Sequence, residues 1–263
     1  MLKNRLVQVN TSDGLYLHGY YVPTQDKKTA LLHIHGFEGN FYENNFIYVL
    51  ADELEKNNIA FLTVNTRGNG SKTDFNTVSG ELRYIGGFKE LLEEAHLDIS
   101  AWIEFLISEG YENIILQGHS LGTFKIVRYL FEGKYADKIN KLILLAPFDI
   151  KTSTDINKAN DWLSKQTYNS WRSEDDFSRM FEFCSKDYDF PILKKIKIPV
   201  KIIVGSKDEY FHLSNPEHPE EAMDILLKNI PNSQGIIIPD AVHSYKPHED
   251  IMAKEVIEFL NNN

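Results

Sequence analysis

Short apolar segments alternate with amphipathic ones along most of the chain, and this alternation constrains the fold more than any other feature. Residues 30–34 and 141–146 are almost continuously apolar, as strands are when both of their faces are buried. Between such segments, apolar residues recur every three or four positions, which is typical of helices with one buried face. Strands that alternate with helices predict a mostly parallel sheet covered by helices on both faces.

The same patterns position the individual elements. The alternating residues 6–9 and 15–22 flank the turn sequence Ser-Asp-Gly and predict an N-terminal hairpin with one solvated face. Further strands are expected at residues 59–64, 113–117, 200–204 and 235–238, and helices at about residues 46–54, 88–108, 121–131, 222–230 and 251–260. The fold class is therefore α/β, with eight strands in the sheet.

Composition and charge exclude several classes of protein. The 263 residues carry 28 basic and 38 acidic side chains, a net charge of −10, which disfavours binding to nucleic acid or to anionic membranes. A single cysteine rules out an internal disulfide. No apolar run has the length of a membrane helix, and residues 1–10 lack a secretory signal. We expect a cytoplasmic protein with one domain over residues 1–263.

One short motif carries chemistry. Gly118-His119-Ser120-Leu121-Gly122 fits the pattern G-x-S-x-G, and it stands between an expected strand and an expected helix. Such a turn lifts the Ser120 hydroxyl into solvent and strains its backbone. The two glycines leave room where a side chain would collide with a neighbouring element. A serine in an ordinary tight turn is the alternative interpretation.

A serine hydroxyl is a poor nucleophile unless an imidazole removes its proton and a carboxylate orients that imidazole. Loops that follow parallel strands meet at one edge of the sheet. Asp208 lies in the loop after the strand expected at residues 200–204, and His243 lies in the loop after residues 235–238. We therefore expect Ser120, Asp208 and His243 to meet at this edge.

With these residues the sequence resembles the α/β-hydrolase superfamily, from the N-terminal hairpin to the last helix. The superfamily's nucleophile falls on Ser120, its acid on Asp208 and its base on His243. The chain is most similar to small serine esterases of the feruloyl or cinnamoyl type. The resemblance implies an α/β-hydrolase fold with a helical lid, and a serine hydrolase that cleaves small-molecule carboxylic esters through an acyl-enzyme, without a metal or an organic cofactor.

The resemblance also implies an oxyanion hole. The superfamily's oxyanion loop follows its third strand with a His-Gly pair, here His35-Gly36, and Phe37 comes next. The backbone N–H groups of Phe37 and Leu121 are expected to bind the negative charge that develops on the carbonyl oxygen.

The substrate pocket is expected to involve an insertion. Residues 150–198 interrupt the strand–helix rhythm, are polar and rich in aromatic residues, and predict a helical lid over the sheet edge. Trp162 and Trp171 within it are candidates to bind an aromatic or medium-chain acyl group, although packing of short helices explains them equally well. Near the oxyanion loop, Tyr42 is a further candidate. Glu38 would offer an acceptor to a cationic or hydroxyl-rich substrate, unless it is only solvated.

Other assignments of the acid and the base stay open. Glu209 is adjacent to Asp208 and would be the alternative acid, and Asp240 lies near enough to His243 to hydrogen-bond it, although a loop-capping role is favoured. His248 follows His243 by five residues and would be the alternative base.

Metal and nucleotide sites are disfavoured. His33 and His35 share one face of a strand and have a spacing that metal sites use, but no matching carboxylate or thiolate cluster accompanies them. Residues 65–73 follow a strand and contain glycines, but they do not fit the phosphate-loop pattern. Within this loop, Arg67 is expected to form a buried ion pair.

Two other classes of function remain open. The same three residues serve thioesterases and amidases or peptidases, which differ from esterases only in the bond that is cleaved. A ligand receptor on this fold would need neither a base nor an oriented acid, so three intact catalytic positions argue against a receptor.

Overall fold

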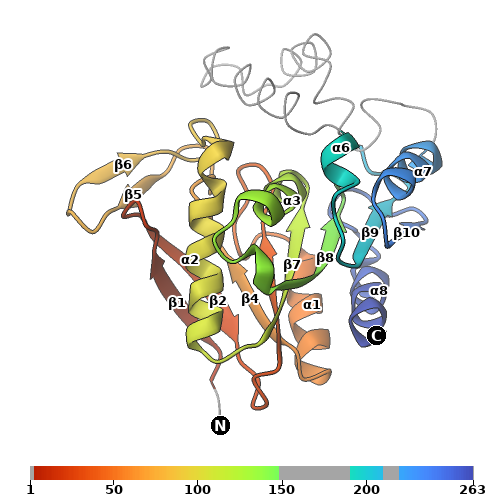
Figure 1. Cartoon of the computed structure of the whole chain (residues 1–263), viewed down its shortest axis with the longest axis horizontal. Coiled ribbons are helices and arrows are strands. Elements are labelled where there is room, and N and C mark those ends of the chain that lie inside the picture. The colour runs from red at the N-terminus through yellow and green to blue at the C-terminus, as the bar shows by residue number, and fades with distance from the viewer. Residues whose placement is uncertain (1–2, 148–189, 210–218, 263) are drawn as a thin grey trace.

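The structure, a computed structural model, describes residues 3–147, 190–209 and 219–262. In this part of the chain, eight strands form one sheet (Figure 1). Across the sheet the order is β1 (Arg5–Asn10), β2 (Tyr16–Val22), β4 (Ala60–Val64), β3 (Thr29–Ile34), β7 (Asn113–His119), β8 (Ile139–Leu145), β9 (Val200–Gly205) and β10 (Ser233–Ile238). The pairs β1–β2 and β2–β4 are antiparallel and the other pairs are parallel. The predicted α/β class and mostly parallel sheet are confirmed.

Helices cover both faces of this sheet. The helices on one face are α1 (Asn45–Lys56) and α8 (Glu249–Asn261), whose apolar side chains share one hydrophobic core. Those contributing to the core on the other face are α2 (Ala95–Ser108), α3 (Leu121–Glu132) and α7 (Pro219–Asn229).

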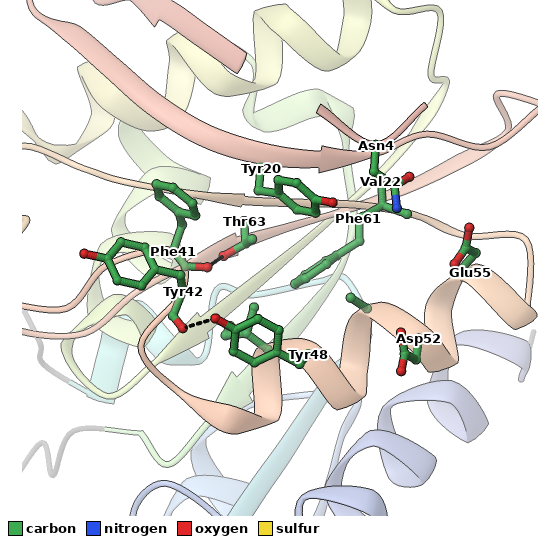
Figure 2. A pocket seen from close by; sticks show the side chains of 12 residues that line it. Asn4, Tyr20, Val22, Phe41, Tyr42, Tyr48, Asp52, Glu55, Phe61 and Thr63 are labelled. Carbon is green, nitrogen blue, oxygen red and sulfur yellow. Dashed lines mark hydrogen bonds between the residues drawn. The ribbon is translucent and has the colours of Figure 1, made fainter. Parts of the chain in front are cut away.

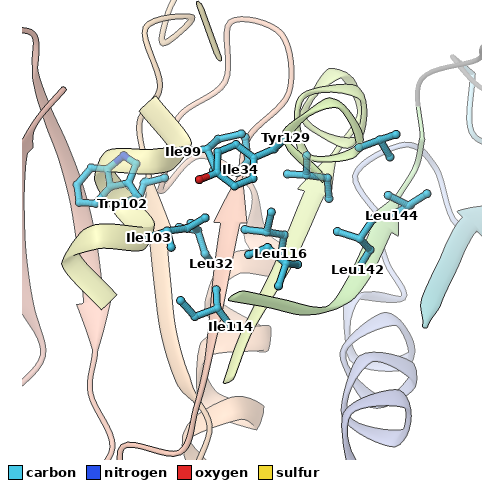
Figure 3. Packing of buried hydrophobic residues seen from close by; sticks show 14 of the residues in the cluster. Leu32, Ile34, Ile99, Trp102, Ile103, Ile114, Leu116, Tyr129, Leu142 and Leu144 are labelled. Carbon is cyan, nitrogen blue, oxygen red and sulfur yellow. The ribbon is translucent and has the colours of Figure 1, made fainter. Parts of the chain in front are cut away.

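Neighbouring residues of the central strand β7 face opposite cores. Ile114 and Leu116 belong to the core that contains Trp102 of α2 and Tyr129 of α3 (Figure 3). Ile115, between them, belongs to the core under α1 and α8. Because both faces of the strand are buried, each interior position needs an apolar side chain. This is the physical reason for the uninterrupted apolar runs in the sequence.

The helix expected over residues 88–108 is wrong in its first part. A 3-10 turn, η1 (Leu92–Glu94), leads directly into α2 at Ala95, and Leu91 before it has an extended backbone, with φ −92° and ψ 113°. Tertiary contacts override the helical spacing here: the Phe88 ring packs 6.2 Å from that of Phe37, and the Glu90 carboxylate pairs with a buried lysine. A continuous helix would not direct both side chains toward the sheet edge.

Several short elements were not expected from the sequence. They are the two-stranded antiparallel ribbon of β5 (Asp74–Asn76) and β6 (Leu82–Tyr84) and the 3-10 turn η2 (Ala136–Lys138). The short helix α6 (Phe190–Leu193) lies within the insertion predicted to be helical. Of the insertion predicted at residues 150–198, only residues 190–198 lie within the described part of the chain, so the lid stays a prediction.

The Arg67 side chain, in the loop after β4, forms ion pairs with carboxylates of two other segments. It is fully buried and lies 2.8 Å from Asp98 of α2 and 3.1 Å from Asp13 of the β1–β2 turn, and it also pairs with Glu94. Its own backbone N–H donates to Asp98 as well, at 2.8 Å. The predicted buried ion pair is therefore confirmed. The cluster ties the hairpin and α2 to the loop after β4.

We expect Asp13 to make the stability of the protein depend on acidic pH. Burial alone would raise its pKa, but the Thr11 hydroxyl and the charges of Arg67 and Arg83 outweigh burial and lower the pKa to about 2 from 3.8. A carboxyl group with a lowered native pKa stabilises the fold above its unfolded-state pKa, and this contribution is lost as the pH falls toward the native pKa. Asp13→Asn should therefore reduce the free energy of unfolding at pH 6, and the deficit should shrink between pH 4 and pH 2. Urea titrations at several pH values would measure it.

Asp137→Asn is the matched control, because the Asp137 side chain is 72% exposed. A deficit for Asp13→Asn that stays constant down to pH 2 would contradict the expectation.

Candidate active site

Ser120 occupies a strained turn between β7 and α3. Its backbone has φ 53° and ψ −125°, a left-handed conformation that costs a non-glycine residue about 1–3 kcal/mol. The turn is held by the Ser120 N–H, which donates to the Leu145 carbonyl at 3.0 Å, and by the Thr123 hydroxyl, which donates to the Ser120 carbonyl at 2.7 Å. Ser120 itself is only partly buried, so its hydroxyl stands at the C-terminal edge of the sheet.

The glycines on either side of Ser120 allow a close approach of backbones. A Cβ on Gly122 would lie 2.3 Å from the Ile34 carbonyl oxygen, and a Cβ on Gly118 would lie 2.5 Å from the backbone of Gly122. Both distances are far below van der Waals contact. The first turn of α3 can therefore pack against the end of β3 only because these positions lack side chains.

Asp208 and His243 meet at the same edge, as expected. Asp208 follows β9 and His243 follows β10, and Nδ1 of the His243 ring lies 2.8 Å from Oδ1 of Asp208. The Asp208 side chain is fully buried and that of His243 is 14% exposed. Because a carboxylate only accepts hydrogen bonds, this contact assigns the proton of the neutral ring to Nδ1 and leaves the Nε2 lone pair available as a base.

Backbone contacts fix the two loops relative to each other. The N–H groups of Ser206 and Lys207 donate to the carbonyls of Ile238 and Ala241, each at 2.9 Å. A Cβ on Gly205 would lie 2.2 Å from the Ala241 oxygen, so this glycine is what allows the loops to touch.

His119 links this pair to the serine. Its Nε2–H donates to the His243 carbonyl at 2.9 Å, and the two imidazole rings are 4.7 Å apart. Burial, together with the nearby His243, lowers the pKa of His119 to about 3, so the ring is neutral at physiological pH. Because His119 directly precedes Ser120, this hydrogen bond ties the His243 loop to the turn that holds the serine.

The alternative acid and base occupy different positions. Glu209 accepts from the backbone N–H of His243 at 3.3 Å, whereas the ring contact is made by Asp208. His248 flanks the start of α8. Asp240 is exposed and pairs with Lys207 at 2.7 Å. The geometry therefore favours Asp208 and His243 as the acid and base.

The expected oxyanion residues flank the serine from two neighbouring strands. β3 and β7 are parallel, with Ile34 opposite Gly118, so the residues after β3 reach those after β7. A Cβ on Gly36 would lie 2.9 Å from Cβ and 3.5 Å from Oγ of Ser120, and Phe37 follows Gly36. Leu121 is the first residue of α3, where backbone N–H groups lack partners within the helix.

Two of the four expected substrate-binding residues, Glu38 and Tyr42, lie within the described part of the chain. Glu38 accepts a hydrogen bond from the Ser71 hydroxyl at 3.1 Å. Tyr42, 54% exposed, borders a groove of about 350 Å³ between α1 and strands β2 and β4 (Figure 2). Its lining includes the rings of Tyr20, Phe41, Tyr48 and Phe61 and none of the three expected catalytic residues. Trp162 and Trp171 lie outside the described residues.

The histidines considered as metal ligands have other partners. Nδ1 of His33 accepts from the Gln117 amide at 3.0 Å, and His35 contacts Thr66 and Gly36. Over the described ranges, no three His, Cys, Asp or Glu side chains are grouped so that they could hold a metal ion. The same ranges contain no helix with the length and apolar character needed to cross a membrane.

Sequence reasoning missed a buried polar cluster beside the site, made by Thr66, Glu90 and Lys125. Nζ of Lys125 lies 2.5 Å from the Glu90 carboxylate, and both side chains are buried. The available signal was the position of Lys125, which follows Leu121 by one helical turn and is therefore on the buried side of α3.

Comparisons with known proteins identify the family and the fold of this chain. A family profile described as serine aminopeptidase, S33, matches residues 25–188, more than half of the chain. The chain belongs to this family. The S33 description is one of serine hydrolases, in line with a serine at the turn after β7. No curated protein matches the chain in sequence.

The solved structures to which this chain is similar have the α/β-hydrolase fold. Est1E from Butyrivibrio proteoclasticus, solved with ferulic acid bound, has a TM-score of 0.73 at 20% identity, over 97% of this chain and 98% of that one. The Pyrococcus furiosus esterase Pf2001 has a TM-score of 0.70 at 19% identity, over 98% and 89%. Mouse alpha/beta hydrolase domain-containing protein 10 has a TM-score of 0.70 at 17% identity, over 98% of each chain. The resemblance to the α/β-hydrolase superfamily is confirmed.

We expect Gly122→Ala to destabilise the protein, because its Cβ would overlap the Ile34 carbonyl oxygen and force α3 away from β3. Overpacking of this kind costs about 1–3 kcal/mol. Gly80→Ala is the control: a Cβ there meets nothing within 4 Å, so only the strain of the positive φ at Gly80, which Gly122 does not share, opposes the change. Urea unfolding would compare the two variants, and equal losses of free energy would refute the packing argument.

Proposed function

We propose that this chain hydrolyses carboxylic esters of small molecules through an acyl-enzyme formed on Ser120. The observation that carries the proposal is the 2.8 Å contact between the His243 ring and the buried Asp208. His119 ties the His243 loop to the strained turn that holds Ser120. The S33 family profile supports serine hydrolysis, and several proteins with the same fold are described as esterases.

The mechanism follows from these positions. Nε2 of His243 removes the Ser120 proton as Oγ attacks the ester carbonyl carbon, and Asp208 stabilises the imidazolium that forms. The backbone N–H groups of Phe37 and Leu121 bind the oxyanion, and each such donor lowers the barrier by about 3 kcal/mol. The imidazolium then protonates the leaving alkoxide, and a water molecule repeats these steps to release the acid.

We also propose the nature of the acyl group. One protein of this fold was solved with ferulic acid, and the insertion at residues 150–198 is rich in aromatic residues. We therefore propose an aromatic or medium-chain acyl group, bound beneath this insertion as a lid of the single domain, in a cytoplasmic enzyme. Glu38, Tyr42, Trp162 and Trp171 remain the proposed substrate-binding residues.

Peptide hydrolysis is the second candidate, because the family description names an aminopeptidase. The two functions require different leaving groups, an alcohol for an esterase and an amine for a peptidase. A panel of nitrophenyl acyl esters, acyl thioesters and aminoacyl nitroanilides would separate them. The proposal requires the highest kcat/KM on the oxygen esters, and a preference for the nitroanilides would replace it with the peptidase.

We expect a fluorophosphonate to label Ser120, because the activated hydroxyl displaces fluoride from phosphorus and keeps the phosphonyl group. Intact-protein mass spectrometry and peptide mapping would locate the adduct. Ser120→Ala should lose both label and turnover while it keeps its melting temperature. A folded wild-type protein without an adduct on Ser120 would favour a non-catalytic receptor.

We expect Asp208→Asn to lower kcat by about 10⁴-fold, because an amide no longer holds the His243 proton on Nδ1. Glu209→Gln, the adjacent control, should retain near wild-type kcat, because Glu209 accepts from the backbone N–H of His243 whereas the His243 ring contacts Asp208. Steady-state kinetics on one ester would measure both variants. If Glu209→Gln were the inactive one, the acid would be misassigned.

A further inference from the structure

A hydrogen-bonded network of buried polar side chains lies beneath the loop that contains Phe37. The exposed fractions of its members are at most 7%, and they come from four separate segments: His35, Thr66, Glu90 and Lys125. We propose that these four side chains are positioning residues that orient the Gly36–Phe37 peptide for oxyanion binding. This inference rests on the proposed function and adds residues that the mechanism above does not use.

The contacts of His35 define which ring nitrogen carries the proton. Its Nε2 accepts from the Thr66 backbone N–H at 3.0 Å and lies 3.1 Å from the Thr66 hydroxyl. A backbone N–H can only donate, so Nε2 is unprotonated. In a neutral imidazole the proton is then on Nδ1, which donates to the Gly36 carbonyl at 2.7 Å.

This hydrogen bond acts on the peptide unit that contains the expected oxyanion donor. The Gly36 carbonyl and the Phe37 N–H belong to one peptide plane and point in opposite directions when the bond is trans, and Lys246–Pro247 is the only cis bond along the described chain. Holding the carbonyl against the His35 ring therefore turns the N–H away from that ring. Gly36 packs on Ser120, so the serine side is where this N–H would act.

Lys125 contacts Thr66 on the side of the network away from Gly36. Its Nζ donates to the Thr66 hydroxyl oxygen at 3.3 Å, which leaves the hydroxyl hydrogen to point at His35. Burial and the positive charge of Lys125 both lower the pKa of His35, to about 3. The ring is thus kept neutral, and a neutral ring is required if Nε2 is to accept while Nδ1 donates.

Glu90 balances the charge of Lys125. Their side chains are buried at 2.5 Å from each other, and a Cβ on Gly68 would lie 2.1 Å from Glu90 Oε2, so the Gly68 backbone leaves the space that the carboxylate fills. Replacing a buried ion pair by apolar side chains is often neutral or stabilising. Stability alone therefore does not account for this pair, whereas orientation of the Gly36–Phe37 peptide does.

The test uses Thr66→Val and the double variant Glu90→Leu/Lys125→Met, with the partly buried pair Lys201 and Glu255 as the control. We expect both test variants to lose kcat, by about tenfold to a hundredfold, since loss of a whole oxyanion donor costs about 10²–10³. KM should stay within twofold, because the donor acts on the transition state. The affinity of a trifluoromethyl ketone, which forms an oxyanion on the enzyme, should fall by the same factor as kcat. Lys201→Met/Glu255→Leu should change none of these quantities.

Two variants of His35 provide a second measurement. Asn presents an amide N–H near the position of Nδ1, so His35→Asn should retain more kcat than His35→Leu at similar melting temperature. In the wild-type protein, nitrogen-15 NMR of the imidazoles should show His35 with its proton on Nδ1. This last readout is independent of any ester hydrolysis.

The outcomes separate this inference from the proposed function. Unchanged kcat and ketone affinity in folded Thr66→Val and in the double variant would overturn the positioning role, as would a proton on Nε2 of His35. An absent Ser120 adduct and absent ester turnover in the wild-type protein would overturn the proposed function, and the positioning role with it, even with the proton on Nδ1.

Discussion

The close packing of α3 against the end of β3 is the constraint on which the rest of the site depends. It is possible only because Gly118 and Gly122 have no side chains, and it holds Ser120 at positive φ between two neighbouring parallel strands. The same packing brings the residues after β3 within contact of the serine. The positions of Ser120 and of the residues after β3 therefore both depend on one backbone contact, which is held in turn by the apolar cores on both faces of the sheet.

The remaining groups reach the serine through loops that are tied to each other. The Asp208 loop and the His243 loop share two backbone hydrogen bonds, and His119 carries the second loop to the turn. Each contact is local, but together they leave the imidazole little freedom. Such preorganisation is what general-base catalysis requires, because a base that has to search for its geometry loses rate.

Two clusters of buried charged side chains lie near the C-terminal ends of the parallel strands. Arg67 with its carboxylates joins the hairpin to α2, and Lys125 pairs with Glu90 next to Thr66 and His35. Buried ion pairs add little net stability because desolvation offsets their attraction, but they impose geometry on the segments that they join. Both clusters hold segments that border the site.

The sequence by itself determined the sheet, because strands with two buried faces and helices with one have different apolar periods. It also predicted Ser120, Asp208 and His243 as catalytic residues, because the turn pattern and the loops after parallel strands point to one edge of the sheet. Only the tertiary structure shows that the His243 ring contacts Asp208 whereas Glu209 accepts from the His243 backbone, because adjacent side chains point in different directions although they share one sequence context. The tertiary structure also shows that residues 88–94 are not part of the expected α-helix. It revealed the pair of Lys125 and Glu90, which depends on contacts between distant segments. Periodicity reports which side of an element is buried, and it carries no information about which polar groups meet inside.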